Sequence, residues 1–427
     1  MKNKFIKSTI ILMLGTMLTK VLGFVIKIIF TRLIKDGINI YSLIMPTYSL
    51  LITITSLGLP FAISTLMARN NHRGIHIIAS IIPVSIIFNI LIVGLTFLFA
   101  PYLANNLLKS PECYYPIIAC ALTLPFTSIS GIIKGYYFGK QNMLPNSISN
   151  IIENLVRLIL TLIFIPILMK KSTILAVSFY LIISGICEIV QILIYLLFAP
   201  KNLKITLHDI KPQTPIINEL LNLSIPSSIS RIIGNISYFF EPIILTNILL
   251  FIGYSSNFIV SEYAIYNAYV IPLLTLPSFI TLAINTTLIP EISSHYNNKE
   301  YIKKILKRIL KYSLIIGTLY CIILYLKGDI LLKLIYDTTN GYEYIKFLSI
   351  FFPLFYLEGP LASTLQGLGL TKYTLKTTFN GIIIKNIILI ITSLFSIGIY
   401  SLLLAEIINI IYVITSNYKK LKTLNYI

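Results

Sequence analysis

Five positively charged side chains interrupt the long apolar runs of this chain. They are Lys20, Lys27, Arg157, Arg231 and Lys385, and their neighbours are almost all Ile, Leu, Phe, Val or Tyr. A cation at membrane depth costs ~2.5–3.5 kcal/mol or more, so it normally faces a wet cavity or an anion. The pattern predicts a membrane protein with a cationic interior, which favours the transport of a negatively charged molecule.

Two predicted helices carry cations in positions that suit phosphate binding. Lys20 and Lys27 are spaced so that both ammonium groups lie on one side of a helix. Arg231 has Asn235 one turn further along, and Arg holds phosphate oxygens through two parallel hydrogen bonds. We expect these four residues, together with Lys385, to bind the substrate.

The same cations also have structural interpretations. Lys27 could extend to the outer membrane interface, as Lys does near helix ends. The same structural interpretation applies to Lys385. Arg231 could pair permanently with Glu241, although their spacing places the two side chains ~80° apart around a helix. The sequence leaves these alternatives open.

Several glutamates also lie within the apolar runs. Glu153 is spaced to pair with Arg157 on one helix, which is either a structural salt bridge or a gate. Glu188 and Glu406 are isolated acids that could exchange protons or sodium ions. We expect gating or ion-coupling roles, with H⁺ or Na⁺ as the ion, for Glu153, Arg157, Glu241, Glu188 and Glu406.

Composition restricts the chain to one broad class. Of its 427 residues 56% are hydrophobic and only 11% are charged, with a mean hydropathy of +0.86. A soluble domain carries about 25% charged residues. The net charge of +19 comes from Lys and Arg that fall between apolar runs and form no basic patch interleaved with exposed aromatics. We therefore expect a polytopic membrane protein that binds no nucleic acid.

The apolar runs long enough to cross a ~30 Å hydrocarbon core predict twelve transmembrane helices. The first is a retained helix, because it is too long for a signal peptide and has no A-x-A cleavage site. With both termini in the cytoplasm, the inner connections carry more than twice as many Lys and Arg as the outer ones. We therefore expect a multi-pass protein of the cell membrane. The predicted spans are 8–34, 42–68, 75–100, 114–139, 147–169, 173–199, 219–248, 262–290, 307–327, 343–368, 373–395 and 397–416.

The two halves of the chain are similar to each other. A hydrophilic cytoplasmic linker, 201–218, separates a six-helix lobe, 1–200, from a second six-helix lobe, 219–427. Because each half has an even number of helices, the halves insert in the same orientation, as parallel repeats around a central cavity. The residues that pair in order are Lys20 with Arg231, Gly23 with Gly234, Tyr41 with Tyr263, Gly139 with Gly369, and Asn150 with Asn380.

Glycine and proline recur inside the predicted spans. Gly131, Gly135 and Gly139 are small residues at four-residue spacing, which allows helices to approach closely. Proline residues such as Pro272 and Pro277 predict kinks or breaks. Such breaks suit helices that bend between two states.

No set of catalytic residues stands out. The chain has no Gly-rich phosphate loop before a Lys-Ser/Thr, no Ser/His/Asp arrangement and no metal-binding cluster. Its four cysteines form no CxxC motif, and its four histidines lie in predicted loops. We expect a protein that is not an enzyme, uses no cofactor or metal, and functions as a monomer.

Four segments resemble the stage V sporulation protein B family, and the first helix, TKVLGFVIKIIFTRLI, also fits. This family is part of the multidrug/oligosaccharidyl-lipid/polysaccharide flippase superfamily. The similarity spans nearly the whole chain. The segments are GYYFGKQNMLPNSISNIIENLVRL (135–158), LSIPSSISRIIGNISYFFEPII (223–244), YAIYNAYVIPLLTLPSFITLAINTTLIPEIS (263–293) and PLFYLEGPLASTLQGLGLTKYTLK (353–376).

The resemblance implies a fold like that of multidrug (MATE) transporters and a specific function. Related members move lipid-linked sugars, including the undecaprenyl-linked peptidoglycan precursor, outward across the membrane. Their pyrophosphate-binding cations occupy positions similar to Lys20, Lys27 and Arg231. Close relatives often carry two more C-terminal helices, which form a groove for the lipid tail. What the related members transport implies that the substrate is a lipid-linked oligosaccharide or another anionic lipid, moved by alternating access.

Three other functions remain as alternatives. A drug or organic-cation antiporter of the same superfamily would need acids to dominate its cavity, whereas here the cations match or outnumber the buried acids. A membrane-embedded polymerase or glycosyltransferase would need a sizeable acidic outer loop. A non-transporting scaffold for spore-cortex assembly is the third alternative.

Overall fold

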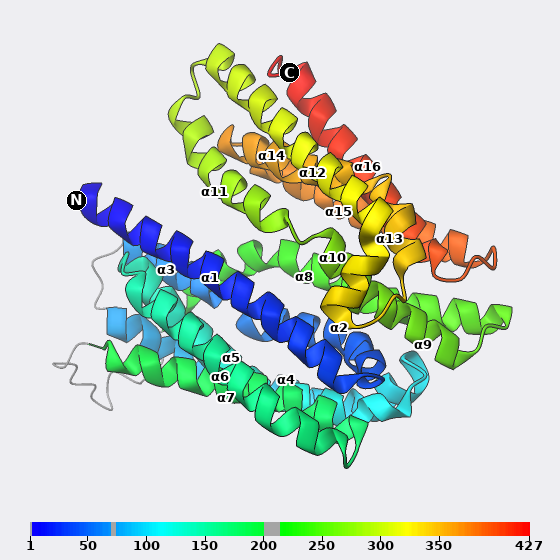
Figure 1. Cartoon of the computed structure of the whole chain (residues 1–427). Coiled ribbons are helices and arrows are strands. Elements are labelled where there is room, and N and C mark those ends of the chain that lie inside the picture. The colour runs from blue at the N-terminus through cyan, green and yellow to red at the C-terminus, as the bar shows by residue number, and fades with distance from the viewer. Residues whose placement is uncertain (1, 70–73, 200–213) are drawn as a thin grey trace. The chain divides into compact units, whose positions relative to one another are not determined.

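The computed structural model describes residues 2–69, 74–199 and 214–427, and these residues form helices and connecting turns without any strand (Figure 1). The sequence favours helices because its long apolar runs are expected to lie in hydrocarbon, where no water can hydrogen-bond to the backbone. A helix satisfies every N–H and C=O group within its own segment. The protein is therefore an all-α polytopic membrane protein, as its composition predicted.

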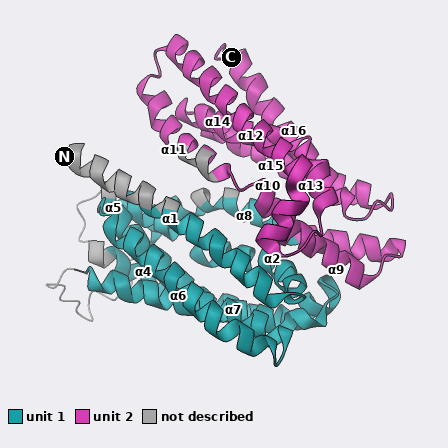
Figure 2. Cartoon of the chain, in the orientation of Figure 1, with its two compact units in different colours: residues 1–239 teal, residues 240–427 magenta. Residues whose placement is uncertain are grey.

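The chain forms two compact units, residues 1–239 and 240–427 (Figure 2). Unit 1 contains the elements up to the first part of α8 (Thr214–Ile252). These elements are α1 (Lys2–Ile34), α2 (Gly37–Ser56), α3 (Leu59–Arg69), α4 (Gly74–Tyr102), the π-helix η1 (Leu103–Leu107), the 3₁₀ helix η2 (Pro111–Cys113), α5 (Tyr114–Gly139), α6 (Leu144–Met169) and α7 (Thr173–Leu197).

Unit 2 contains the second part of α8 and all the elements that follow it. These elements are α9 (Ser256–Ile265), the π-helix η3 (Tyr266–Val270), α10 (Ile271–Leu274), α11 (Ser278–Ser294), α12 (Lys299–Tyr336), α13 (Tyr342–Ser349), the 3₁₀ helix η4 (Phe352–Leu354), α14 (Phe355–Gly367), α15 (Thr371–Ser393) and α16 (Tyr400–Thr423).

The elements follow the order that the predicted spans require. Among the described residues, nine helical spans are long and apolar enough to cross a membrane, or ten if the pair bent by 63° at 342–367 counts as one span. The other two predicted spans correspond to α1 and to the interrupted segment from α9 to α11. Each half thus runs through a long helix, a broken helix and four further spans.

The broken helices owe their interruptions to identifiable residues. Between α2 and α3, Leu57 and Gly58 adopt left-handed backbone angles, with φ of 44° and 64°, a conformation that glycine adopts without steric cost. In the equivalent segment of unit 2, α10 ends at Leu274 and Pro277 directly precedes α11. The break predicted at Pro277 is confirmed.

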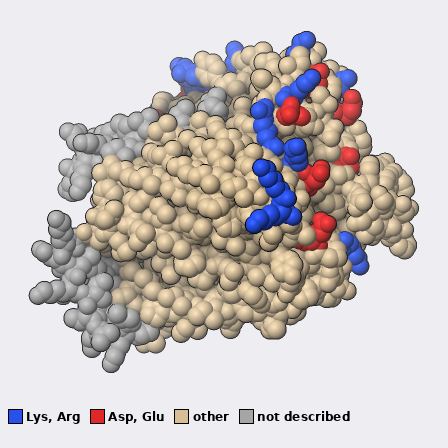
Figure 3. Space-filling view, turned by 60° about the horizontal axis from the view of Figure 1, so that its bottom comes forward, with Lys and Arg blue, Asp and Glu red and all other residues tan. Residues whose placement is uncertain are grey.

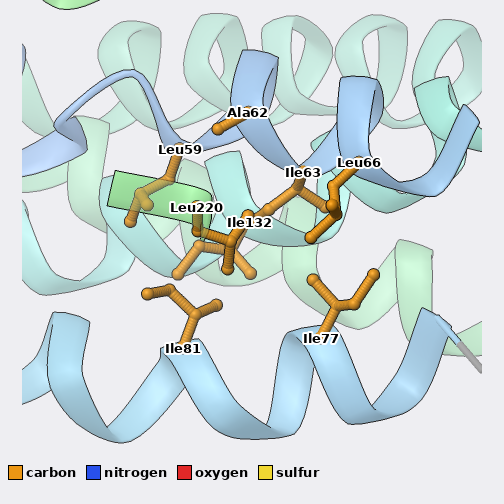
Figure 4. Close-up of a cluster of buried hydrophobic side chains, with 8 residues drawn as sticks. All are labelled: Leu59, Ala62, Ile63, Leu66, Ile77, Ile81, Ile132 and Leu220. Carbon is orange, nitrogen blue, oxygen red and sulfur yellow. The ribbon is translucent and has the colours of Figure 1, made fainter. Parts of the chain in front are cut away.

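The glycines of α5 allow the close helix packing that their spacing predicted. A Cβ atom on Gly135 would lie 2.7 Å from the carbonyl oxygen of Pro60, and one on Gly139 would lie 2.6 Å from the Cβ of Met67. Only glycine therefore fits where α5 crosses α3. Buried aliphatic side chains extend this contact to α4 and to α8 (Figure 4). The cluster consists of Leu59, Ala62, Ile63, Leu66, Ile77, Ile81, Ile132 and Leu220.

The helix α8 is continuous across the division between the two units. Its first part packs into unit 1 through Leu220, whereas its residues from Phe240 onward belong to unit 2. The predicted division assigns residues 214–218 of this helix to the linker, 201–218, and the rest of the helix to the second lobe, 219–427. Most of the predicted linker, 201–213, lies outside the described residues.

Much of the surface carries no charge. The face drawn in Figure 3 has a broad area without Lys, Arg, Asp or Glu. Exposed side chains such as Leu98, Phe251 and Leu334 are large and apolar, each at least 70% exposed. A surface of this kind is suited to the hydrocarbon of a bilayer and would be unfavourable in water.

Candidate functional site

The five intramembrane cations fall into two groups. Arg157 and Lys385 each form ion pairs with carboxylates. Lys20, Lys27 and Arg231 form no ion pair with any side chain that the structure describes. Lys20 and Arg231 are exposed, and Lys27 is half-buried. The first group is electrically compensated within the protein, and the second still requires an anion or water.

Lys385 lies at the centre of an ionic cluster in unit 2. Its Nζ, on α15, is 2.7 Å from Oε1 of Glu241 on α8 and 2.7 Å from Oε2 of Glu406 on α16. The Lys385 side chain is 12% exposed, and the two glutamate side chains are 6% and 18% exposed. Three helices are thus joined by one ammonium group. Glu241 pairs with Lys385, so the alternative in which it pairs with Arg231 is not observed.

A fourth ionisable side chain lies near this cluster and was not singled out from the sequence. Glu358, on α14, is close enough to Glu406 for their carboxyls to interact electrostatically. The hydroxyl of Tyr266, in the π-helix η3, is similarly close to Lys385. The acid in the middle of the predicted span 343–368 could have indicated Glu358. The position of Tyr266 depends on a π-helix that no sequence pattern predicted.

Glu153 and Arg157 form the salt bridge that their spacing on α6 predicted. The Arg157 Nη2 is 2.6 Å from Glu153 Oε1, and Arg157 Nη1 donates to the hydroxyl of Ser184 on α7 at 3.0 Å. The side chain of Gln191 donates to Asn150 Oδ1 at 2.7 Å and to Glu153 Oε2 at 3.3 Å. The pair is therefore anchored in a polar network between α6 and α7.

Two further residues extend this network towards α5. The hydroxyl of Ser130 donates a hydrogen bond to the side-chain oxygen of Gln191. Glu188, on α7, lies within electrostatic range of Glu153 and Arg157. Sequence spacing identified Glu153 and Arg157, and Glu188 was identified as an isolated acid in an apolar run. It did not identify Gln191 or Ser130, because uncharged polar residues on separate helices give no periodic signal.

Asn235 fastens α8 to α2 within unit 1. Its Oδ1 accepts a hydrogen bond from Ser49 at 2.8 Å, and its Nδ2 donates to Thr53 Oγ1 at 2.8 Å. The same Nδ2 is 3.0 Å from the backbone oxygen of Arg231. The amide expected to contact substrate is therefore engaged in helix packing, one turn away from the unpaired Arg231 guanidinium.

These features define a class of protein. Apolar helices, some of them interrupted, form two compact units that each hold an ion pair or ionic cluster, and this is a fold found in membrane transporters. An inward-facing multidrug resistance MATE family transporter of the MOP superfamily has a similar structure, with a TM-score of 0.78 and 15% identity over 95% of each chain. The lipid II flippase MurJ, in an inward closed conformation, has a TM-score of 0.69 and 15% identity over 97% of this chain and 87% of MurJ.

Sequence similarity assigns the family. The sequence profile of the polysaccharide biosynthesis protein family matches residues 5–295. Stage V sporulation protein B of Bacillus subtilis (strain 168) is 31% identical over 426 residues, which cover 96% of this chain and 82% of that protein. The chain therefore belongs to the polysaccharide biosynthesis protein family, in the flippase branch that contains stage V sporulation protein B.

Proposed function

We propose that this protein is a flippase for an anionic lipid-linked sugar, a peptidoglycan or spore-cortex precursor. It would move this substrate outward across the cell membrane by alternating access, with both termini in the cytoplasm. The observation that carries the proposal is the absence of a carboxylate partner for Lys20, Lys27 and Arg231 among the described residues. The name of the lipid II flippase MurJ supports a lipid-linked substrate, and the name of stage V sporulation protein B supports a role in sporulation.

The unpaired cations are assigned to the pyrophosphate of the substrate. A membrane cation without an internal counter-ion is costly, so a bound anion stabilises it directly. The Arg231 guanidinium suits a phosphate because its N–H groups can donate two parallel hydrogen bonds. Lys20 and Lys27 add charge from α1. Asn235 holds the turn of α8 that carries Arg231, and its amide becomes available to the sugar when Ser49 and Thr53 release it.

The paired cations are assigned to gating and ion coupling. Lys385 was expected among the substrate-binding residues, but Glu241 and Glu406 already compensate its charge. Two carboxyls for one ammonium group leave one carboxyl that can take up H⁺ or Na⁺ while the other keeps its partner. In unit 1, Glu188 stands beside the Glu153–Arg157 pair in a similar relation. The membrane potential supplies ~2.3 kcal/mol per charge per 100 mV for such exchange.

A reconstituted flipping assay tests the substrate and the binding residues together. Proteoliposomes would contain lipid-linked disaccharide-pentapeptide and the parent protein, Lys20→Ala or Arg231→Ala. We expect each variant to lower the flipping rate by about tenfold or more, because a charge-assisted hydrogen bond contributes ~1.5–3 kcal/mol. Lys170→Ala, which removes an exposed lysine at the end of α6, is the matched control and should flip at the parental rate.

The outcomes of this assay separate the possibilities. If the parent flips the lipid and both Ala variants flip it at the same rate, the proposed binding roles of Lys20 and Arg231 are wrong. A parent that moves an organic cation but leaves the lipid-linked sugar in place would favour the antiporter. A parent that moves neither would favour the scaffold.

A further inference from the structure

The first turns of α12 carry a dense group of cations. This helix runs from Lys299 to Tyr336 with a kink at Lys327, and the 28 residues before the kink are more than the ~20 that cross a hydrocarbon core. Its uncharged stretch runs from Tyr312 to Leu326. Glu300 is the single acid among the residues 299–311. The cations of this portion are Lys299, Lys303, Lys304, Lys307, Arg308 and Lys311.

One row of α12 joins these cations to its lipid-facing side chains. Lys304, Arg308, Lys311, Ile315 and Ile322 follow one another at intervals of four, three, four and seven residues, which keeps them on the same side of the helix. Ile315 and Ile322 are 42% and 49% exposed, as expected for side chains that face hydrocarbon. One turn of the helix is about 5.4 Å along its axis. Lys311 and Arg308 therefore extend the lipid-facing row by about one and two turns beyond Ile315, to the depth of the lipid headgroups.

The opposite side of the same turns is buried in unit 2. Ile302 and Leu306 have no exposed surface, and Ser313 is also fully buried. The helix is thus fixed by its apolar side and cannot rotate to carry the cationic row away from lipid. Its start is capped by the side chain of Asn298, which accepts a hydrogen bond from the N–H of Tyr301 at 3.0 Å.

The exposed cations of this portion of α12 form no ion pair with any side chain that the structure describes. Lys299 differs, because its Nζ lies over the ring of Tyr426 at 5.4 Å. The other four exposed cations lie at i, i+3, i+4 and i+7, which forms one continuous patch. They are Lys304, Lys307, Arg308 and Lys311.

We propose that these four residues, here named the α12 patch, form a binding site for the headgroups of anionic phospholipids. The ligand is a lipid of the bilayer and not the transported molecule. The Arg308 guanidinium can donate two hydrogen bonds to one phosphate, and the lysines add positive charge at headgroup depth. The apolar residues of the row receive the acyl chains of the same lipid.

Fluorescence quenching by brominated lipids tests this proposal, because the chain contains no Trp. Tyr312 is 56% exposed and directly follows Lys311, so Tyr312→Trp provides a single reporter at the α12 patch. The protein is reconstituted into mixtures of phosphatidylglycerol and phosphatidylcholine in which one lipid or the other is brominated. We expect phosphatidylglycerol to bind at this reporter about fivefold more strongly. This preference should fall towards one in ~1 M salt.

The variants separate a specific site from a general preference for anionic lipid. Neutralising the α12 patch by four Lys or Arg→Gln substitutions should abolish the preference at the Tyr312→Trp reporter, whereas the charge-conserving Lys304→Arg, Lys307→Arg and Lys311→Arg triple variant should retain it. The control variant neutralises four exposed lysines elsewhere and should leave the preference unchanged. Its substitutions are Lys35→Gln, Lys109→Gln, Lys170→Gln and Lys171→Gln.

A second reporter checks the fold of the neutralised protein. Leu98→Trp, at a 76% exposed position on α4, should show nearly equal binding of the two lipids in the parent and in the neutralised variant. Equal binding of the two lipids at the Tyr312→Trp reporter in the parent would overturn the proposal. A preference that survives neutralisation of the α12 patch, or that disappears equally in the control variant, would also overturn it.

Discussion

The two units compensate a half-buried cation in different ways. In unit 1, Arg157 pairs with Glu153 on its own helix at 2.6 Å. In unit 2, Lys385 pairs with Glu241 and Glu406, which come from two other helices, at 2.7 Å each. A pair within one helix survives any movement of that helix. A cluster shared by three helices depends on their relative positions, so it is the arrangement that can respond to a conformational change.

The internal repeat makes this difference sharper. The register that aligns Lys20 with Arg231 also aligns Phe30 with Glu241. Phe30 stacks on Tyr180 with ring centroids 3.5 Å apart, and its edge meets Tyr41 at 4.9 Å. The same place in the two halves is therefore an aromatic contact in unit 1 and an ionic contact in unit 2. Aromatic packing carries no charge, so only the second half is suited to bind or release an ion at this position.

The largest effect on stability is expected from Lys385→Met. This change leaves the buried carboxyl of Glu241 and the half-buried carboxyl of Glu406 without their shared partner, and breaking a buried ion pair costs ~3–5 kcal/mol. The free energy of unfolding, measured by titration with sodium dodecyl sulfate in mixed micelles, should fall by that amount. Lys385→Arg keeps the charge and should lose much less.

A second variant separates lost charge pairing from lost packing at this cluster. The triple variant Lys385→Met, Glu241→Gln and Glu406→Gln removes all three charges. It should recover most of the stability lost in Lys385→Met. A Lys385→Met protein that is as stable as the parent would show that the cluster does not hold the three helices together.

A smaller loss is expected from Arg157→Met. Glu153 would lose its ion pair but would keep the hydrogen bond from Gln191, which is 3.3 Å from Glu153 Oε2. Losing one hydrogen bond to a charged group costs ~1.5–3 kcal/mol. The same titration should therefore place this variant between the parent and Lys385→Met. The double variant Arg157→Met, Glu153→Gln should regain part of the loss, and a loss larger than that of Lys385→Met would reverse the comparison of the two units.

The sequence was sufficient to predict the helical spans but not the partners of the charges. Hydropathy identifies a span because each residue contributes independently to its transfer into lipid. The Glu153–Arg157 pair was predictable because its spacing is fixed by one helix. Lys385 and Glu241 are 144 residues apart, so their contact depends on how separate helices pack. A lone charge in an apolar run shows that a partner is needed, but it does not say which residue supplies it.

The same reasoning explains what was missed. Gln191 and Ser130 are uncharged, so the free-energy cost of placing them in an apolar run is small. Their presence in such a run therefore does not indicate a functional role. Asn235 was found from its spacing to Arg231, but its partners Ser49 and Thr53 lie on α2, far away in sequence. Local spacing therefore predicted which helix face is polar, and only the fold revealed what that face contacts.

The smallest effect on stability is expected from neutralising an unpaired cation. Arg231→Gln or Lys20→Gln leaves no carboxylate without a partner among the described residues, since neither side chain forms an ion pair there. The hydrogen bond between Asn235 and Arg231 uses the backbone oxygen of Arg231, so it remains when the Arg231 side chain is changed. The free energy of unfolding should therefore stay within about 0.5 kcal/mol of the parent, as for surface substitutions.

Measured beside Arg157→Met in the same micelles, these two variants test the division of the cations most directly. Paired cations should matter for stability, and unpaired cations should matter for flipping. A loss of stability in Arg231→Gln as large as that in Arg157→Met would mean that the arginine supports the fold through its side chain. The guanidinium would then be committed to the protein, and the phosphate-binding role would pass to α1. Unchanged stability combined with slow flipping would instead keep Arg231 free for the substrate.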